Sequence, residues 1–284
     1  MQTRRTTVGN DRVFAAIVKW HRNHALQQCL ADGESCPERV IRAHSVQSAH
    51  IMAYLARAGH VYMFQTTGQG HQLSLVGHHT ATTFTGFCAE HDLHLFREVD
   101  FDNSRAFDPA SPRQMVLLAL RAAAREYWLK LNNQKFYQRL VELVDRADYE
   151  SLGRMLNLEN ADAVRFTLIR EEVWKPILLG TKVSLRRIQR LFHSLYQQVQ
   201  TGSFHLTRTA LFQIPGSPTV AAASAFAPEF DLTGKQLNTL RLESDVTDVT
   251  LNVMPAESAT WVVFTYHRRH TGRFYVLGEA CTCI

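Results

Sequence analysis

The stretch FTGFCAEHDLHLF, residues 84–96, carries one cysteine and two histidines between a β-prone run and a helical one. Cys88 and His91 are separated by two residues, and Asp92 follows at once, with His94 two positions further. Zinc in proteins takes thiolate and imidazole ligands, usually delivered as two short pairs from separate turns. The Cys-x-x-His spacing therefore predicts one half of a tetrahedral zinc site.

The second half of that site has three candidates upstream. Cys29 and Cys36 flank a turn-rich stretch, although six residues separate them, and His44 follows soon after. Two ligand sets are open: Cys29, Cys36, Cys88 and His91, or Cys36, His44, Cys88 and His91. We prefer the first set because it leaves His44 for another task. A core of packed thiols without metal is the alternative interpretation.

The composition describes a chain with a sizeable core. At 284 residues and 45% hydrophobic content, we expect about two domains. The sequence has no apolar run long enough to cross a membrane and no secretory signal at its basic N-terminus. The five cysteines are odd in number and sparse, which argues against a disulfide framework. We therefore expect a cytoplasmic protein without membrane contact.

The histidines are concentrated near the N-terminus. Ten of the fourteen precede residue 95, together with three of the five cysteines. This clustering indicates that the first hundred residues form a unit with its own chemistry. The net charge of +5 is mild and is compatible with an acidic partner such as DNA or RNA.

The order of helical and β-prone segments predicts an α+β fold in three regions. Residues 1–104 are expected to form a zinc-binding domain, residues 105–204 a helical region and residues 205–284 a β-rich region. The final residues, GEACTCI, stop abruptly after a predicted strand, so we expect that the chain is cut from a longer one.

Hydrophobic periodicity and turn residues place the elements within these regions. Residues up to about 15 read as a flexible basic lead. The expected helices are 14–26, 45–58, 91–99, 112–131, 134–144, 162–174 and 184–200. The expected strands are 60–65, 73–76, 80–87, 206–214, 219–226, 246–254, 260–267 and 273–278.

The order of cysteine pair, hairpin and helix with a second pair resembles a treble-clef zinc fold. The segments IRAHSVQ and GFCAEHDLHLF are similar to zinc-containing HNH endonucleases, and to uncharacterised bacterial proteins that share C…C…AHS, GHV and GFC..HD patterns. The resemblance covers residues 29–96, about a quarter of the chain.

The HNH resemblance implies roles for individual residues. His44, in the step Ala43-His44, matches the general base that activates water, and Cys88 matches the first cysteine of the closing pair. His91 stands where the second cysteine would be, and Asp92 where the family has a histidine that binds the catalytic metal. The family's middle asparagine has no counterpart here. A catalytic Mg²⁺ or Mn²⁺ is implied in addition to the structural Zn²⁺, because aspartate can bind either ion.

Two functions follow from these observations. The first is a metal-dependent nuclease, or a nucleic-acid binder derived from one, with His44 and Asp92 as catalytic residues. The second is a non-catalytic protein in which zinc only staples a small domain and the other regions recognise a protein partner. A cluster of three arginines is either a phosphate-binding stripe or a solvated helix face: Arg186, Arg187 and Arg190.

Overall fold

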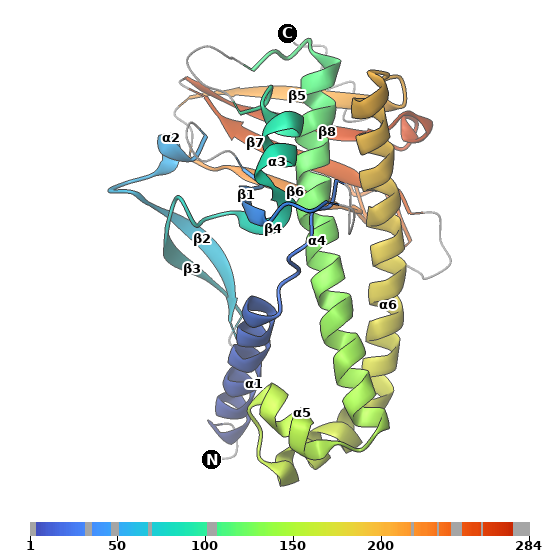
Figure 1. The fold of residues 1–284 in the computed structure, drawn as a ribbon. Coiled ribbons are helices and arrows are strands. Elements are labelled where there is room, and N and C mark those ends of the chain that lie inside the picture. The colour runs from blue at the N-terminus through green and yellow to red at the C-terminus, as the bar shows by residue number, and fades with distance from the viewer. Residues whose placement is uncertain are drawn as a thin grey trace. The chain divides into compact units, whose positions relative to one another are not determined.

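Over its described residues, the computed structural model mixes helices with three sheets, as the α+β prediction requires (Figure 1). It describes residues 4–31, 36–46, 51–67, 70–100, 107–216, 219–231, 233–239, 246–256 and 258–274. No helix within these ranges is both long and apolar enough to cross a membrane.

Two compact units make up the chain, and each is assembled from separate segments. The first unit comprises residues 1–26, 62–76 and 129–185. The second unit comprises residues 27–61, 77–128 and 186–284. The three regions expected from the sequence are continuous stretches of chain, whereas each of these units combines separate segments. The three regions therefore stay a prediction.

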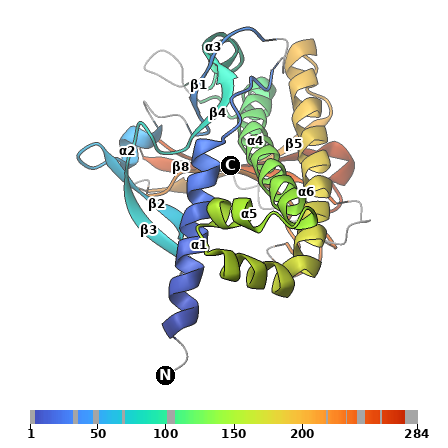
Figure 2. The same ribbon diagram turned by 60° about the horizontal axis from the view of Figure 1, so that its bottom comes forward.

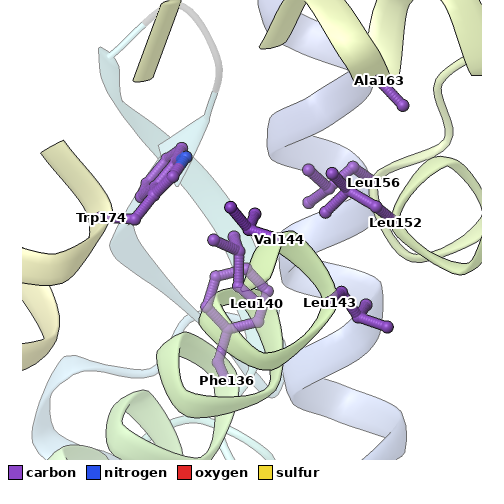
Figure 3. Packing of buried hydrophobic residues seen from close by; sticks show 8 residues of the cluster. All are labelled: Phe136, Leu140, Leu143, Val144, Leu152, Leu156, Ala163 and Trp174. Atoms are coloured by element: carbon purple, nitrogen blue, oxygen red, sulfur yellow. The ribbon is translucent and has the colours of Figure 1, made fainter. Parts of the chain in front are cut away.

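The first unit is a helical core around α1 (Arg4–Asn23), α5 (Tyr149–Leu156) and parts of two long helices. Both views show α1 beside α5 (Figures 1 and 2). At the start of α5, the carboxylate of Asp148 accepts a hydrogen bond of 3.0 Å from the backbone N–H of Ser151. Figure 3 shows the buried side chains of this core: Phe136, Leu140, Leu143, Val144, Leu152, Leu156, Ala163 and Trp174.

The first helix begins earlier than the sequence suggested. The lead up to residue 15 was expected to be flexible, but α1 starts at Arg4. Val13, Ile17 and Trp20 pack against the core cluster of the first unit. Spacing of three and four residues puts these side chains on one helix face, so burial of that face stabilises the helix.

The long helix α4 (Pro112–Asp145) was wrongly predicted as two helices. The expected break fell at the polar pair Asn132-Asn133, a sequence that favours turns. Asn132 is instead 2% exposed, and its side-chain oxygen accepts a hydrogen bond of 2.7 Å from the backbone N–H of Leu26. The polar side chain therefore caps a neighbouring segment and leaves the helix intact.

The other long helix, α6 (Asn160–Thr201), was also predicted as two helices. It contains Pro176, which cannot donate a backbone hydrogen bond and usually kinks or ends a helix. Trp174 is buried and Ile177 packs against the same core cluster, one on each side of the proline. Packing on both sides outweighs the local stop signal.

The C-terminal sheet belongs to the second unit and has the order β5-β8-β7-β6, with every neighbouring pair antiparallel. Its strands are β5 (Thr207–Pro215), β6 (Ala222–Phe226), β7 (Val249–Pro255) and β8 (Ala259–His267). One face carries a small core of Ala210, Val249, Tyr266 and Phe274. The four strands confirm four of the expected ones, and most of the fifth, 273–278, lies outside the described residues.

Three of the remaining strands confirm the short β-prone runs near the N-terminus, whereas the strand at Val40–His44 was not expected. The hairpin joins β2 (His60–Thr67) to β3 (Gly70–Gly77). A second two-stranded sheet pairs β1 (Val40–His44) with β4 (Thr83–Cys88), which leads directly into α3 (Ala89–Phe96). The helix expected over 45–58 is shorter: α2 covers Ala53–Leu55, and residues 47–50 lie outside the described part.

Truncation of Leu152 tests the core of the first unit. Leu152 is fully buried among the cluster residues, so Leu152→Ala should lower the free energy of unfolding by about 2–5 kcal/mol. Leu179→Ala is the matched control, because Leu179 is 48% exposed, and it should cost no more than about 0.5 kcal/mol. Urea denaturation measures both, and an equal loss in the two variants would contradict the assignment of this core.

Candidate metal centre

Strand β4 and helix α3 meet at Cys88, which ends the strand and caps the helix. The Cys88 sulfur accepts a hydrogen bond of 3.3 Å from the backbone N–H of His91, one helical turn further on. The same spacing turns the imidazole back toward the thiol, and Nδ1 of His91 lies 3.1 Å from the Cys88 sulfur. A strand that becomes a helix at Cys88 therefore presents two donor atoms to one point.

The loop with Cys29 and Cys36 brings two more sulfur atoms to this point. The backbone N–H of Leu30 donates to the carbonyl of Gly86 at 2.8 Å, which fixes the loop against β4. Gly86 permits the close approach: a Cβ there would lie 2.5 Å from the Phe84 ring and 3.2 Å from Leu30. The Cys29 and Cys36 sulfurs lie 3.4 Å and 3.6 Å from Nδ1 of His91.

The dimensions of the cluster fit a tetrahedral ion. Ligand atoms of all four residues lie within 4.8 Å of one another. Zinc–sulfur and zinc–nitrogen bonds of usual length would put sulfur and nitrogen about 3.6 Å apart at the edge of a tetrahedron. The preferred ligand set is thus brought together: Cys29, Cys36, Cys88 and His91. The alternative set is not, because His44 does not belong to this group.

The chemistry of the cluster is compatible with a bound cation. Cys29 and Cys88 are buried, and none of the three cysteines forms a disulfide. The backbone hydrogen bond from Glu38 lowers the pKa of Cys36, but burial and the thiols of Cys88 and Cys29 raise it to about 11. Crowding of the thiols therefore opposes ionisation in the absence of a cation. A bound metal reverses this, since it binds the thiolates and releases their protons.

His44 lies at the end of β1, opposite Thr83 of β4. Its ring is half-buried, and burial lowers its pKa, which the carbonyl of Ala81 partly offsets. Arg121 and His79 lower the pKa further, whereas Asp100 raises it. The lowered pKa favours the neutral imidazole near pH 7. Its Nδ1 atom is buried and has no hydrogen-bond partner among the described residues.

Asp92, next to His91 on α3, is also largely buried. Burial raises the pKa of its carboxyl group to about 6, Arg121 lowers it, and Asp100 raises it. One carboxylate oxygen, Oδ1, is buried without a hydrogen-bond partner in the described part of the chain. The two residues predicted to be catalytic, His44 and Asp92, thus share the influence of one ion pair, Arg121 with Asp100.

Sequence reasoning missed that ion pair. Arg121 is 4% exposed, donates a hydrogen bond of 2.7 Å to Asp100, and lies 4.4 Å from the centre of the Phe96 ring. A lone arginine inside the apolar run of residues 115–124 was the available signal, because a buried guanidinium requires a partner. The identity of that partner could not be read from the spacing.

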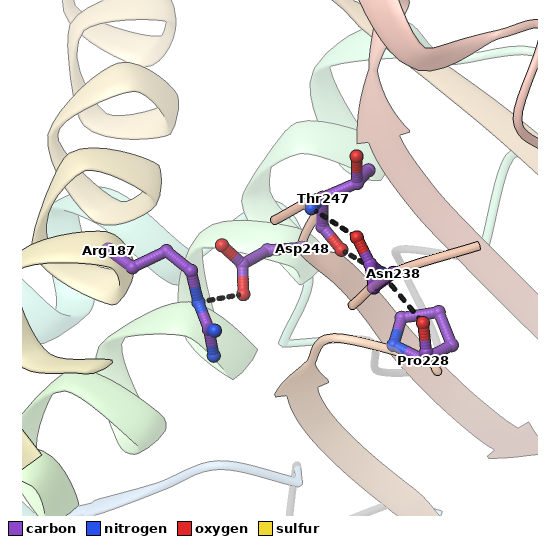
Figure 4. Close-up of polar contacts among 5 residues, drawn as sticks. All are labelled: Arg187, Pro228, Asn238, Thr247 and Asp248. Atoms are coloured by element: carbon purple, nitrogen blue, oxygen red, sulfur yellow. Dashed lines mark hydrogen bonds and ion pairs between the residues drawn. The ribbon is translucent and has the colours of Figure 1, made fainter. Parts of the chain in front are cut away.

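The cluster of three arginines on α6 is divided. Arg187 turns to Asp248, whose Oδ1 lies 2.9 Å from its Nε (Figure 4). Burial raises the pKa of Asp248 to about 6, although Arg187 lowers it. Neighbouring residues of the same segment are held by Asn238, which donates to the carbonyls of Pro228 and Thr247. Arg187 therefore belongs to the structure of the second unit, whereas Arg186 and Arg190 are exposed.

No protein-family model matches this chain, and no curated protein or solved structure is similar enough to count as a match. Function must therefore be argued from the residues themselves, and the HNH resemblance stays a prediction.

Replacement of His91 tests the cluster as a metal centre. The purified protein should contain one metal ion per chain, and His91→Ala should lose it because one of four ligands is gone. His94→Ala is the matched control, since His94 lies on the same helix, is exposed and is no member of the cluster. Elemental analysis gives both the identity and the amount of the metal. Equal metal content in the two variants would contradict the assignment.

Proposed function

We propose that Cys29, Cys36, Cys88 and His91 hold a structural Zn²⁺ and that this zinc supports a treble-clef, HNH-like unit acting on nucleic acid. Three thiolates and one imidazole are soft ligands that suit zinc better than magnesium or calcium. The order of loop, β1, β4 and α3 agrees with the order of elements in the fold that the sequence resembles.

The catalytic part of the proposal rests on His44. One observation carries it: a neutral, half-buried imidazole with an unpartnered Nδ1 shares an electrostatic environment with a carboxylate that also has an unpartnered oxygen. A general base must be unprotonated at the working pH and must have a free lone pair. The lowered pKa of His44 meets the first requirement and the bare Nδ1 favours the second.

In the proposed reaction His44 takes a proton from a water molecule that attacks a phosphodiester. A bond forms from the water oxygen to phosphorus, and the bond to the leaving oxygen breaks. A Mg²⁺ or Mn²⁺ ion with Asp92 among its ligands would supply charge stabilisation at the phosphate. The bare Oδ1 of Asp92 fits that role. Arg121 holds Asp100, so both charges stay fixed beside the two catalytic residues.

The decisive experiment is a cleavage assay on DNA and RNA with Mg²⁺ or Mn²⁺. His44→Ala should reduce cleavage by about 10²-fold or more, the usual contribution of a general base. Its zinc content and melting temperature should stay close to those of the unchanged protein. His60→Ala is the control histidine, because its Nδ1 is already bonded to the Ala58 carbonyl at 2.8 Å. Loss of zinc together with activity in His44→Ala would mean that His44 acts as a ligand and not as the base.

The pH dependence of cleavage gives a second test. The base works only when unprotonated, and burial puts the pKa of His44 below its usual 6.5. The rate should therefore be level near pH 7 and fall as the pH drops through that lowered pKa. A rate that already falls between pH 8 and pH 7 would exclude His44 as the group that titrates, because its pKa would then have to be raised.

A second candidate function is recognition of a protein partner by a zinc-stapled scaffold without catalysis. The hairpin of β2 and β3 favours it, because four large apolar side chains are more than half exposed: Tyr62 72%, Phe64 75%, Leu73 58% and Leu75 58%. Two-stranded hairpins are also marginally stable alone. This candidate is favoured over the nuclease if no nucleic acid is cleaved with either ion and if a protein that co-purifies with the unchanged chain no longer co-purifies with Phe64→Ser.

A further inference from the structure

The exposed face of α6 in the second unit carries a continuous row of polar side chains. They line one shallow hollow of about 430 Å³. Their spacing of three and four residues puts them on one face of the helix. The row, called the α6 stripe below, consists of Arg186, Gln189, Arg190, His193, Ser194 and Gln197.

The opposite face of this segment is committed to packing. Ile188, Phe192 and Leu195 are buried, and the centres of the Phe192 and Tyr127 rings lie 5.4 Å apart. Arg187 points away from the stripe to Asp248. The helix therefore cannot turn its polar row inward, and the stripe stays on the surface of the second unit.

The charge of the stripe is unbalanced. Arg186 and Arg190 are four residues apart, where like charges repel on a helix surface. Six arginines of the described chain have carboxylate partners: Arg113, Arg121, Arg139, Arg154, Arg165 and Arg187. Arg186 and Arg190 have no ion pair within the described residues, and no carboxylate lines the hollow. Two guanidinium groups without a carboxylate partner on one helix face are available to an anionic ligand from outside the chain.

The chemistry of the stripe narrows that ligand. Guanidinium groups bind phosphate oxygens through two parallel N–H donors, and the side chains of His193, Ser194 and Gln197 add neutral donors. From Arg186 to Gln197 the helix rises about 16 Å, enough for more than one phosphate of a nucleic-acid strand. No Phe, Tyr or Trp ring, on which unpaired bases would stack, lines the hollow, and His193 is its one ring.

We infer that the α6 stripe binds the phosphate backbone of duplex nucleic acid, with Arg186 and Arg190 as its charged contacts and without reading the base sequence. The inference rests on the proposed function, because it names the surface that would hold the substrate of the His44 site. It assigns no residue to the reaction itself.

Charge-matched variants test the stripe. The double variant Arg186→Gln, Arg190→Gln removes both contacts, and Arg154→Gln, Arg165→Gln removes the same charge from exposed arginines of the first unit that have carboxylate partners. Fluorescence anisotropy with a short labelled duplex DNA, without added Mg²⁺ or Mn²⁺, reports binding by the full chain. At about 0.1 M salt the stripe variant should bind about tenfold more weakly, and the control should change less than about twofold.

The salt dependence of binding separates contact from general attraction. The plot of log K against log salt has a negative slope. Loss of two phosphate contacts should reduce the magnitude of this slope by about two, whereas the control should leave it unchanged. Equal weakening in both double variants, or none in the stripe variant, would overturn the inference. The inference would also be overturned if polyglutamate of matched charge displaced the labelled duplex as well as unlabelled duplex does. The surface would then be a general polyanion site.

The two proposals fail in different ways. If the stripe variant loses binding as expected while the unchanged protein cleaves nothing, the result supports binding by the stripe and contradicts the catalytic role of His44. If His44→Ala abolishes cleavage while the stripe variant binds duplex normally, the catalytic proposal stands and the stripe is a solvated helix face.

Discussion

The candidate site of the second unit depends on the convergence of three sulfur atoms and one imidazole nitrogen within 4.8 Å. Thiols packed this closely oppose one another's ionisation, and the pKa of Cys36 rises to about 11 in part because of the adjacent thiols. A cation removes this conflict by binding the deprotonated thiols. The same point fixes the loop of Cys29 against β4 and sets the start of α3, so the positions of His44 and Asp92 follow from it.

Local signals in the sequence were sufficient where one short segment determines the structure. The Cys-x-x-His spacing predicted the half-site at Cys88 and His91, and β-prone residues between turn residues predicted the hairpin and the C-terminal strands. Local signals misled where distant packing decides. Asn132 and Pro176 both indicate a helix end, yet α4 and α6 continue through them, because burial along the helices outweighs the preference of one residue.

Ion pairs between distant segments were beyond the sequence. Arg121 binds Asp100 and Arg187 lies beside Asp248, and neither pairing follows from spacing. Both pairs join an arginine of a long helix to a carboxylate outside it. The first pair sets the electrostatic surroundings of His44 and Asp92. The second takes one arginine out of an apparent basic cluster, which leaves Arg186 and Arg190 to define the charge of the α6 surface.

The segment between β1 and β4 is weakly constrained in its length. Cys29 and His91 are 62 positions apart, and the hairpin of β2 and β3 lies between them. Bringing the ends of a loop of this size together costs the folding chain about 4 kcal/mol of conformational entropy. Doubling the loop adds only about 0.6 kcal/mol to the closure cost. The segment between β1 and β4 can therefore lengthen, shorten or exchange its hairpin over evolution while the ligand cluster keeps its geometry.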